Sequence, residues 1–346
     1  MKFITGKVIL FIFLFFNLLC FGACQDMPSS PGIATGVWVS IFSKDRVHYS
    51  KEAVVRLVDR CKSSNINQIY LQVYQSGNAY YDTSILPRGK YKDMLNAANG
   101  EDAIDFLLTR ARENNIQVFA WVNLLSLGNN DKADILEKFG RDILTKDQFG
   151  RPSGRANPND SDKYYLREDL LFLEPGDQKV ARYLIAVVEE IIERYPLFSG
   201  VHLDYARYPM TVPFIPGSRF TGQGLSYGFG EKNIERFTEW TGLDPLKDLR
   251  SAKDYISWDG WRREQITSLV RRISKKVKDR SFGYMVSCAV VPSAERAYSS
   301  MFQDWPFWLE EGIIDYAVLM NYTLDNQLTR QLVRSALSYA GKARSL

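Results

Sequence analysis

The segment GVHLDYARYP at residues 200–209 places one carboxylate inside an otherwise apolar run. Gly200 to Leu203 have the pattern of a buried strand, and Asp204 follows where that strand would reach its carboxyl end. Enzymes built on parallel strands keep their catalytic groups at this end. The segment therefore indicates Asp204 as a catalytic nucleophile or base. An ion pair with Arg207 that serves only the structure is the alternative interpretation.

Polar and aromatic residues occur near the ends of five other apolar runs, at positions two residues apart. Because alternate residues of a strand point to the same side, such positions share one face of a sheet. The residues predicted for this face are Trp38, Ser40, Gln72, Tyr74, Trp121, Asn123, His202, Asp204, Ser287 and Asn321. The opposite positions, such as Val39, Val122 and Leu203, are aliphatic and suited to packing against helices. The pattern predicts a polar pocket at the mouth of the sheet.

The chemistry of this pocket suits a neutral ligand that is rich in hydroxyl groups. Sugars stack on indole and phenol rings, while amides and carboxylates bind their hydroxyls. Glycoside hydrolysis needs two carboxyl groups, separated by roughly 5 to 5.5 Å for retention or 6.5 to 9.5 Å for inversion. With Asp204 as one, we rank Glu295 first as the other, because its loop would adjoin that of Asp204. Further acids expected on the same side are Asp45, Asp82, Glu174 and Asp325.

Other classes of function lack their sequence signatures. The only histidines are His48 and His202, without the spacing of a metal site, so no metal is expected and His202 is interpreted as a donor in the pocket wall. The chain has no glycine-rich nucleotide motif, so no cofactor is expected. The 44 basic and 40 acidic side chains form no basic stripe, which excludes nucleic acid as an expected partner.

Apolar runs with β-type composition alternate with helical periodicity from Ala34 onwards, which is typical of βα units and a parallel sheet. The expected strands are 36–42, 66–74, 116–124, 200–209, 282–291 and 313–321. Helices are expected from the N-cap Ser50, around 104–111 and 180–192, and over 231–241, 257–278, 304–311 and 328–340. Short and long loops alternate as in a TIM-type (β/α) barrel, which we favour over a doubly wound open sheet. Residues 35–346 would form this barrel, which stops after six βα units and lacks two C-terminal strands.

The first 23 residues have the anatomy of a secretory signal peptide: Lys2 and Lys7 precede an apolar run that ends in small residues. Cys24 follows directly and is expected to be lipidated, with residues 24–34 as a linker. Ordinary cleavage after Ala23 and an uncleaved anchor are the alternatives. The protein is thus expected to be exported and anchored by lipid in the cell envelope, on the outer membrane facing the periplasm if the source has two membranes. Cys61 and Cys288 are expected to be buried free thiols.

Eight motifs in order give the chain a family resemblance. They are GVWVS, QVYQSGNAYYDTSILPRG, FAWVNLL, FLEPGDQKVARYL, GVHLDYARYP, SYGFG, WDGWRREQI and QDWPFWLEEGIIDYAVLMNYT. This series resembles the glycosyl-hydrolase-like family 10 proteins of bacteria, from about Thr35 to Asn326. The resemblance implies a TIM barrel and an envelope-associated glycosidase acting on peptidoglycan glycan strands or another polysaccharide.

On the resemblance, Asp204 matches the family's strand-four aspartate. Residues in matching strand-end motifs, which would bind substrate, are Trp121, Asn123, His202, Tyr205, Arg207, Asn321 and Tyr322. Asn78 stands where an aspartate is expected, and an amide cannot replace a carboxyl group as acid or base. The hypothesis is a glycoside hydrolase with Asp204 and Glu295. The alternative is a glycan-binding lipoprotein without activity, or an inactive, truncated family member. Nothing in the sequence indicates an oligomeric state.

Overall fold

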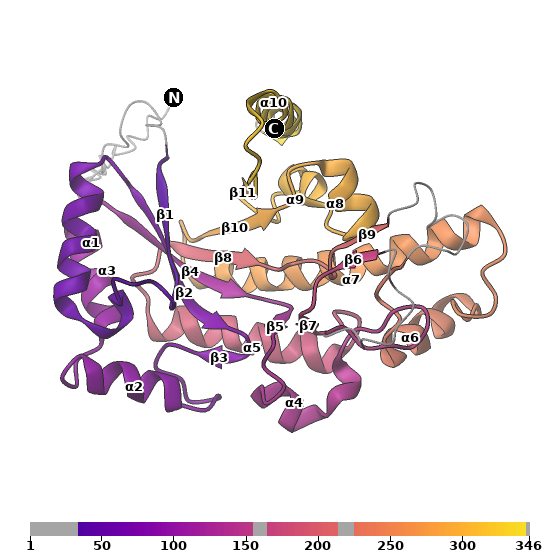
Figure 1. Ribbon diagram of the computed structural model, residues 1–346, viewed down its shortest axis with the longest axis horizontal. Helices are drawn as coiled ribbons and strands as arrows, with labels where there is room; N and C mark the ends of the chain where they lie inside the picture. Colours follow the sequence, from indigo (N-terminus) through magenta and orange to yellow (C-terminus); the bar gives the residue numbers. More distant parts are fainter. Residues whose placement is uncertain (1–33, 155–164, 214–224, 344–346) are drawn as a thin grey trace, which may run out of the picture. The chain divides into compact units, whose positions relative to one another are not determined.

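Six parallel strands form the centre of the protein in a computed structural model that describes residues 34–154, 165–213 and 225–343 (Figure 1). The sheet has the order β1-β2-β4-β8-β10-β11, and every neighbouring pair in it is parallel. The strands are β1 (Gly36–Val39), β2 (Gln68–Gln75), β4 (Gln117–Asn123), β8 (Gly200–Asp204), β10 (Met285–Val290) and β11 (Tyr316–Leu319). Each lies within a run of the sequence that predicts a strand, although the fourth ends at Asp204 rather than at Pro209.

The sheet is an open half-barrel. It curls so that its inner face carries aromatic and polar side chains, but in the described ranges no pairing joins β11 to β1. The α/β architecture with six parallel strands agrees with the barrel type predicted from the sequence. Each long strand is followed by a segment that returns the chain to the opposite end of the sheet, as parallel pairing requires.

Ten α-helices accompany these strands in the described part of the chain. They are α1 (Lys51–Ser63), α2 (Gly89–Ala97), α3 (Ala103–Glu113), α4 (Asp134–Phe139), α5 (Gln178–Arg194), α6 (Glu231–Thr241), α7 (Ala252–Arg280), α8 (Ala294–Ser300), α9 (Trp305–Glu310) and α10 (Asn326–Ala343). Side-chain caps fix several helix starts. Ser50 accepts a hydrogen bond from the Ala53 amide before α1, and Asp177 accepts one from Lys179 before α5.

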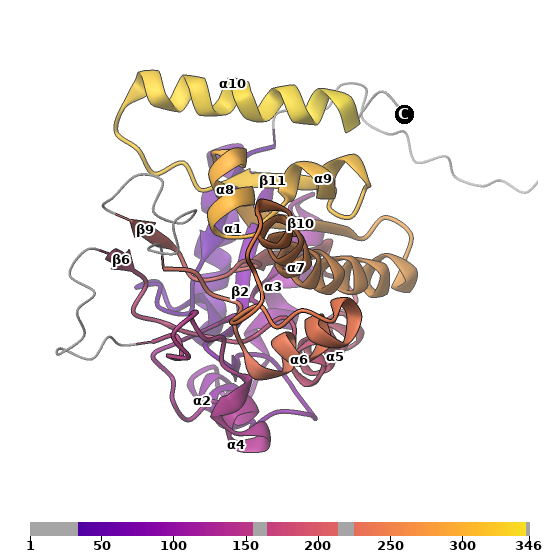
Figure 2. The ribbon, with the colours of Figure 1, turned by 90° about the vertical axis from the view of Figure 1, so that its right-hand side faces the viewer.

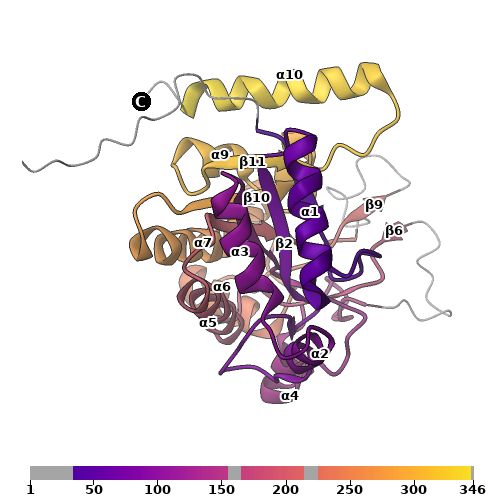
Figure 3. The ribbon, with the colours of Figure 1, turned by 90° about the vertical axis from the view of Figure 1, so that its left-hand side faces the viewer.

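The helices cover the outer side of the sheet. Figure 3 shows α1 and α3 side by side, and α5 packs against α7 in the same layer. Aliphatic residues of the strands, such as Leu71 and Leu203, are fully buried together with Val188 of α5 and Val270 of α7. In Figure 2, α10 lies beside α9 at the β11 end of the sheet. The aliphatic face predicted from the sequence is therefore the core, where burial contributes most of the stability.

The long connections contain small elements that periodicity did not predict. The short strands are β3 (Asn78–Ala79), β5 (Ser126–Gly128), β6 (Tyr165–Arg167), β7 (Leu171–Phe172) and β9 (Thr211–Pro213), and the 3₁₀ turns are η1 (Val47–Tyr49) and η2 (Arg141–Ile143). The antiparallel pair β5-β7 lies within the connection that follows β4, and the pair β6-β9 joins that connection to the one that follows β8. They give the carboxyl side of the sheet a defined structure.

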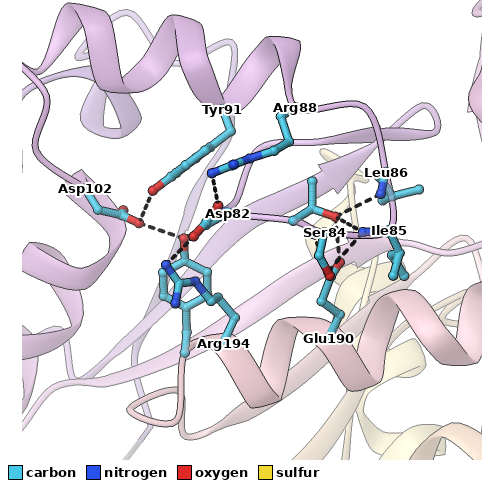
Figure 4. Close-up of polar contacts among 11 residues, drawn as sticks. Asp82, Ser84, Ile85, Leu86, Arg88, Tyr91, Asp102, Glu190 and Arg194 are labelled. Carbon is cyan, nitrogen blue, oxygen red and sulfur yellow. Dashed lines mark hydrogen bonds and ion pairs between the residues drawn. The ribbon is translucent and has the colours of Figure 1, made fainter.

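One helix carboxylate holds the loop after β3 in place (Figure 4). Glu190 of α5 accepts hydrogen bonds from Tyr81 (2.8 Å), from Thr83 (2.6 Å), and from the amide and hydroxyl groups of Ser84 (2.5 and 2.7 Å). The Ile85 amide adds a fifth at 3.2 Å. Beside this cluster, Asp82 forms ion pairs with Arg88 and Arg194.

Cys61 and Cys288 are buried and free, as predicted. The signal peptide, the lipidation site Cys24 and the linker up to residue 33 lie outside the described residues. Among the helices that the structure describes, none combines the length and the hydropathy that a membrane crossing requires.

Candidate functional site

The strand register brings the predicted polar residues to one face. Trp121 of β4 pairs with His202 of β8, and Asn123 pairs with Asp204. On the other sides, Gln72 of β2 pairs with Trp121, and His202 with Ser287 of β10. Since paired neighbours in a parallel sheet point to the same side, these side chains form successive layers on the inner face. Trp38 belongs to the same face, through its pairing with Tyr70.

Asp204 lies at the top of this face, at the last residue of β8. The Tyr205 amide donates to its Oδ1 (2.8 Å), and the indole N–H of Trp121 donates to its Oδ2 (3.2 Å). Burial raises the pKa of Asp204; the two hydrogen bonds and the charge of Arg207 act in the opposite direction, and the charge of Glu168 adds to the rise. The carboxyl group therefore keeps its proton to a higher pH than an exposed aspartate does, which suits a proton donor.

The backbone turns sharply directly after this carboxylate. Tyr205 has a φ of 54°, in the left-handed region that residues other than glycine rarely adopt. Its ring packs against Phe172 with centroids 5.8 Å apart, and the guanidinium of Arg207 lies 5.0 Å from its centre. These contacts hold the strained residue in place, so Asp204 is set on a rigid turn.

A cavity of about 410 Å³ opens in front of Asp204. Its walls include two indole rings and the first residues after β11; the lining residues are Trp38, Trp121, Asp204, Ala289, Val318, Leu319, Met320, Asn321 and Tyr322. Trp38 is 44% exposed and Tyr322 is 89% exposed, so both present ring surface to solvent. In the described part of the chain, no hydrogen-bond donor reaches the buried Oδ1 of Asn321. The cavity thus combines aromatic faces, one amide acceptor and one carboxyl group.

Below the cavity lies an aromatic layer. Tyr70 stacks on Trp38 with centroids 4.6 Å apart, and the His202 ring lies 4.7 Å from Tyr70. His202 is fully buried, its Nδ1 is 2.9 Å from the Ser287 hydroxyl, and burial lowers its pKa to about 3. The imidazole is therefore neutral at ordinary pH. The structure places His202 beneath the pocket and not among the residues that line it.

Gln72 and Asn123 do not line the cavity either. The Gln72 amide donates to Asn123 Oδ1 (3.3 Å), and its own Oε1 accepts from the Ser40 hydroxyl (2.9 Å). Both amides are buried. Their side-chain hydrogen bonds connect the residue that follows β1 with β2 and β4.

The ion-pair partner of Arg207 is Glu168, and not Asp204 as the alternative interpretation of the sequence had it. Its two terminal nitrogens donate to the two oxygens of Glu168 at 2.7 and 2.9 Å, and the Met210 amide donates to Glu168 at 2.7 Å. Arg207 is buried beneath the loop, so its predicted place at the mouth is corrected to a supporting one. Glu168 was missed in the sequence because it lies in a long polar connection far from any strand end.

Two further predictions about the pocket are wrong. Tyr74 does not share the face of Gln72, because the β2-β4 register shifts between them and pairs Tyr74 with Val122 on the helix side. Glu295 is exposed in the first turn of α8, where Ser293 (3.2 Å) and Tyr339 (3.5 Å) contact it, and it does not line the cavity. A bulge and a short helix, neither visible as periodicity, explain both errors.

Nothing in the described residues resembles a metal centre: across residues 34–154, 165–213 and 225–343, no three His, Cys, Asp or Glu side chains are grouped so that they could bind an ion. Of the two histidines, His48 contacts the Gln72 carbonyl (2.7 Å), and burial lowers its pKa to about 4.

The residues around Asp204 can donate a proton, stack on a ring and hydrogen-bond hydroxyls. The sequence missed Tyr70, although it has the same spacing from Gln72 as the predicted residues have from one another.

Known proteins resemble this chain in sequence. The family described as "Glycosyl hydrolase-like 10" matches residues 34–342. The glycosyl hydrolase DigH of Escherichia coli K12 is 22% identical over 291 residues, which are 78% of this chain and 58% of DigH. The glycosyl hydrolase YngK of Bacillus subtilis is 22% identical over 307 residues, covering 84% of this chain and 50% of YngK. The chain therefore spans about half the length of these relatives.

Solved structures resemble it in fold. The glycoside hydrolase domain of PgaB (BpsB) from Bordetella bronchiseptica aligns with a TM-score of 0.59 at 16% identity, over 90% of this chain and 82% of that domain. The β-galactosidase of the psychrophilic Marinomonas ef1 aligns with a TM-score of 0.54 at 11% identity, over 84% of this chain and 41% of the enzyme. At these identities the likeness establishes a TIM-barrel-like fold and nothing finer.

Proposed function

Since the chain belongs to the glycosyl hydrolase-like 10 family, we propose that it hydrolyses the glycosidic bonds of a cell-envelope polysaccharide, with Asp204 as the proton donor. The substrate class is the glycan strand of peptidoglycan or a related polysaccharide. The observation that carries the proposal is the position of Asp204: a half-buried carboxyl group with a raised pKa, at the end of β8, facing a cavity with indole walls.

The cavity fits a pyranose ring. Trp38 and Trp121 offer flat apolar surface to the C–H face of a sugar, and Asn321 offers an acceptor to a hydroxyl group. Such a lining favours a neutral sugar, because Arg207 is bound by Glu168 and does not line the cavity.

In the proposed reaction, Asp204 gives its proton to the glycosidic oxygen as the bond from that oxygen to the anomeric carbon breaks. The electron pair of that bond stays on the leaving oxygen, which takes up the proton. Water then adds to the anomeric carbon and gives one proton to the Asp204 carboxylate, which restores the acid. The sequence favours Asp204 as nucleophile or base. Its burial favours the acid instead, since a general acid must hold its proton near the working pH.

Glu168 would assist without touching the sugar. Both of its oxygens already accept hydrogen bonds from Arg207, and one also accepts from the Met210 amide. We therefore assign it a positioning role, in which it holds Arg207 against the turn at Tyr205.

A second candidate function is glycan binding without cleavage. It is favoured by the single carboxyl group among the described residues that line the cavity, together with the position of Glu295 outside it. Asn78, which stands where an aspartate was expected, uses its side-chain amide to approach the carbonyls of Gln75 and Ser76 at 3.5 and 3.4 Å. It closes a turn.

The experiment that separates the two functions is incubation with peptide-free peptidoglycan strands and a panel of neutral polysaccharides. We expect new reducing ends, with shortened products identified by mass spectrometry. Unaltered ligand that is nevertheless retained by the protein would establish binding instead.

We also propose that the protein is exported and anchored by lipid at Cys24, supported by the apolar leader and the small residues before that cysteine. Fractionation tests this: the wild type should be found with membranes and a Cys24→Ser variant should not.

A further inference from the structure

A second cavity lies in the α6-α7 region, separate from the one at Asp204. Its volume is about 520 Å³, and its lining includes Gln148, Ser226, Leu246, Tyr255, Ile256 and Asp259. We propose that this cavity, here called the α6-α7 cleft, is a distal subsite that binds a sugar unit of the same polysaccharide chain. The inference rests on the proposed function and extends it to substrate length.

The cleft is built on its own small core. Phe229, Phe237 and Trp258 are buried against one another, with Trp258 4.8 Å from Phe237 and 5.3 Å from Phe229 between ring centroids. Arg262 is buried below, where it bonds Asp259, the Ser226 hydroxyl and the Tyr227 carbonyl. The floor is therefore rigid and its shape is set before a ligand arrives.

The walls combine the two surfaces that a sugar requires. Leu246 is 49% exposed, Tyr255 is 46% exposed and Ile256 is 68% exposed, so apolar area faces solvent in a concave site. Gln148, Ser226 and Asp259 place an amide, a hydroxyl and a carboxylate along the same cleft. A pyranose has apolar faces and a hydroxylated edge, which matches this arrangement.

The cleft lies on the carboxyl side of the sheet. Gln148 follows β4 and Ser226 follows β8, so both come from connections that leave the same end of the sheet as Asp204. In Figure 1 the arrowheads of β4 and β8 point towards the side on which α6 lies.

The cleft floor is also continuous with the turn that carries Asp204. At Gly228, where φ is +104°, an added Cβ would lie 2.5 Å from Arg262 Cδ and 3.2 Å from the Tyr208 ring. Only glycine fits at position 228, where the backbone passes between the side chains of Arg262 and Tyr208. The Tyr208 hydroxyl donates to Glu174 (2.7 Å), which also accepts from the Gly230 amide (3.2 Å). Through Gly228 and the buried Tyr208, the floor of the cleft is thus packed against the segment that follows Asp204.

The test measures binding and cleavage separately, with peptide-free peptidoglycan strands and chito-oligosaccharides sorted by length. In an Asp204→Asn background, Tyr255→Ala and Leu246→Ala should each weaken binding of long strands about tenfold, while binding of a disaccharide is unchanged. In the active protein, the same substitutions should raise KM for long strands and leave kcat unaltered.

Trp240→Ala is the matched control, since Trp240 is a 68% exposed aromatic of α6 that does not line the cleft. Binding equal to wild type for Tyr255→Ala at every length would overturn the proposal, and so would an equal loss in Trp240→Ala. A concentration-dependent dimer that Tyr255→Ala abolishes would likewise assign this surface to a second copy of the chain. If the wild type binds long strands through the cleft without cleaving them, the proposed hydrolase activity is wrong and the subsite stands.

Discussion

The indole N–H of Trp121 donates to Oδ2 of Asp204 across 3.2 Å, from β4 to the neighbouring strand β8. This bond favours the charged carboxylate, while burial favours the neutral acid. The protonation of Asp204 is thus set by neighbours that can be changed one at a time.

Replacing Asp204 with asparagine should lower kcat by roughly 10²- to 10⁴-fold, because an amide has no proton to give to the leaving oxygen. Reducing-end release from glycan strands is the measurement. Glu295→Gln is the control and should be as active as wild type, since Glu295 lies outside the cavity. An active Asp204→Asn enzyme would assign the chemistry to another residue.

Trp121→Phe should move the alkaline limb of the pH profile of kcat/KM upward, by on the order of one pH unit. Loss of the indole N–H removes a bond to the charged form, so the pKa of Asp204 rises and the acid keeps its proton to higher pH. A limb that moves downward would contradict Asp204 as the proton donor, whatever the change in rate.

Glu168→Gln should shift the same limb in the opposite direction. The negative charge of Glu168 raises the pKa of Asp204, and the positive charge of Arg207 lowers the same pKa. Neutralising Glu168 therefore leaves the effect of Arg207 unopposed. The limb should fall by on the order of one pH unit. Tyr205 and Tyr322 also face Asp204 and remain unchanged in this variant. An unmoved limb together with a normal thermal transition would refute the positioning role.

Gly200→Ala should destabilise the protein by at least about 3 kcal/mol. An added Cβ would lie 1.9 Å from the Met285 carbonyl oxygen, which forces β8 and β10 apart. The control is Gly260→Ala in α7, where no atom lies within 4 Å and alanine should stabilise the helix by about 0.5 to 1 kcal/mol. Urea denaturation gives both free energies of unfolding, and equal values for the two variants would disprove this close approach.

Tyr74→Phe should leave kcat/KM unchanged, because the register shift turns Tyr74 towards the helices. Trp38→Ala, on the inner face, should lower it. Loss of activity in Tyr74→Phe would mean that the hydroxyl group reaches substrate after all.

Strand alternation predicted the inner face correctly wherever the strand was regular. Trp38, Trp121 and Asp204 could be assigned to the cavity from spacing alone, since each is two residues from another inward residue of its strand or pairs across the register. Tyr74 could not, because a single bulge inverts the alternation and leaves no mark in composition. Local sequence thus fixes the face of a regular strand and fails at its irregularities.

The positions of loop residues could not be predicted from strand alternation, for a different reason. Glu168 comes close to Arg207, 39 residues further along the chain, through an antiparallel pairing of β6 with β9. Glu295 was ranked from loop adjacency, but its side chain is directed by the first turn of α8 instead. Both depend on tertiary contacts that no periodicity encodes.

The five hydrogen bonds that Glu190 accepts have a consequence for local unfolding of the protein. The amides of Ser84 and Ile85 are protected from exchange with deuterium only while α5 stays docked, so the loop after β3 and the end of α5 should open as one cooperative unit. A segment that looks like an exposed connection would then exchange as slowly as the helix to which it is tied.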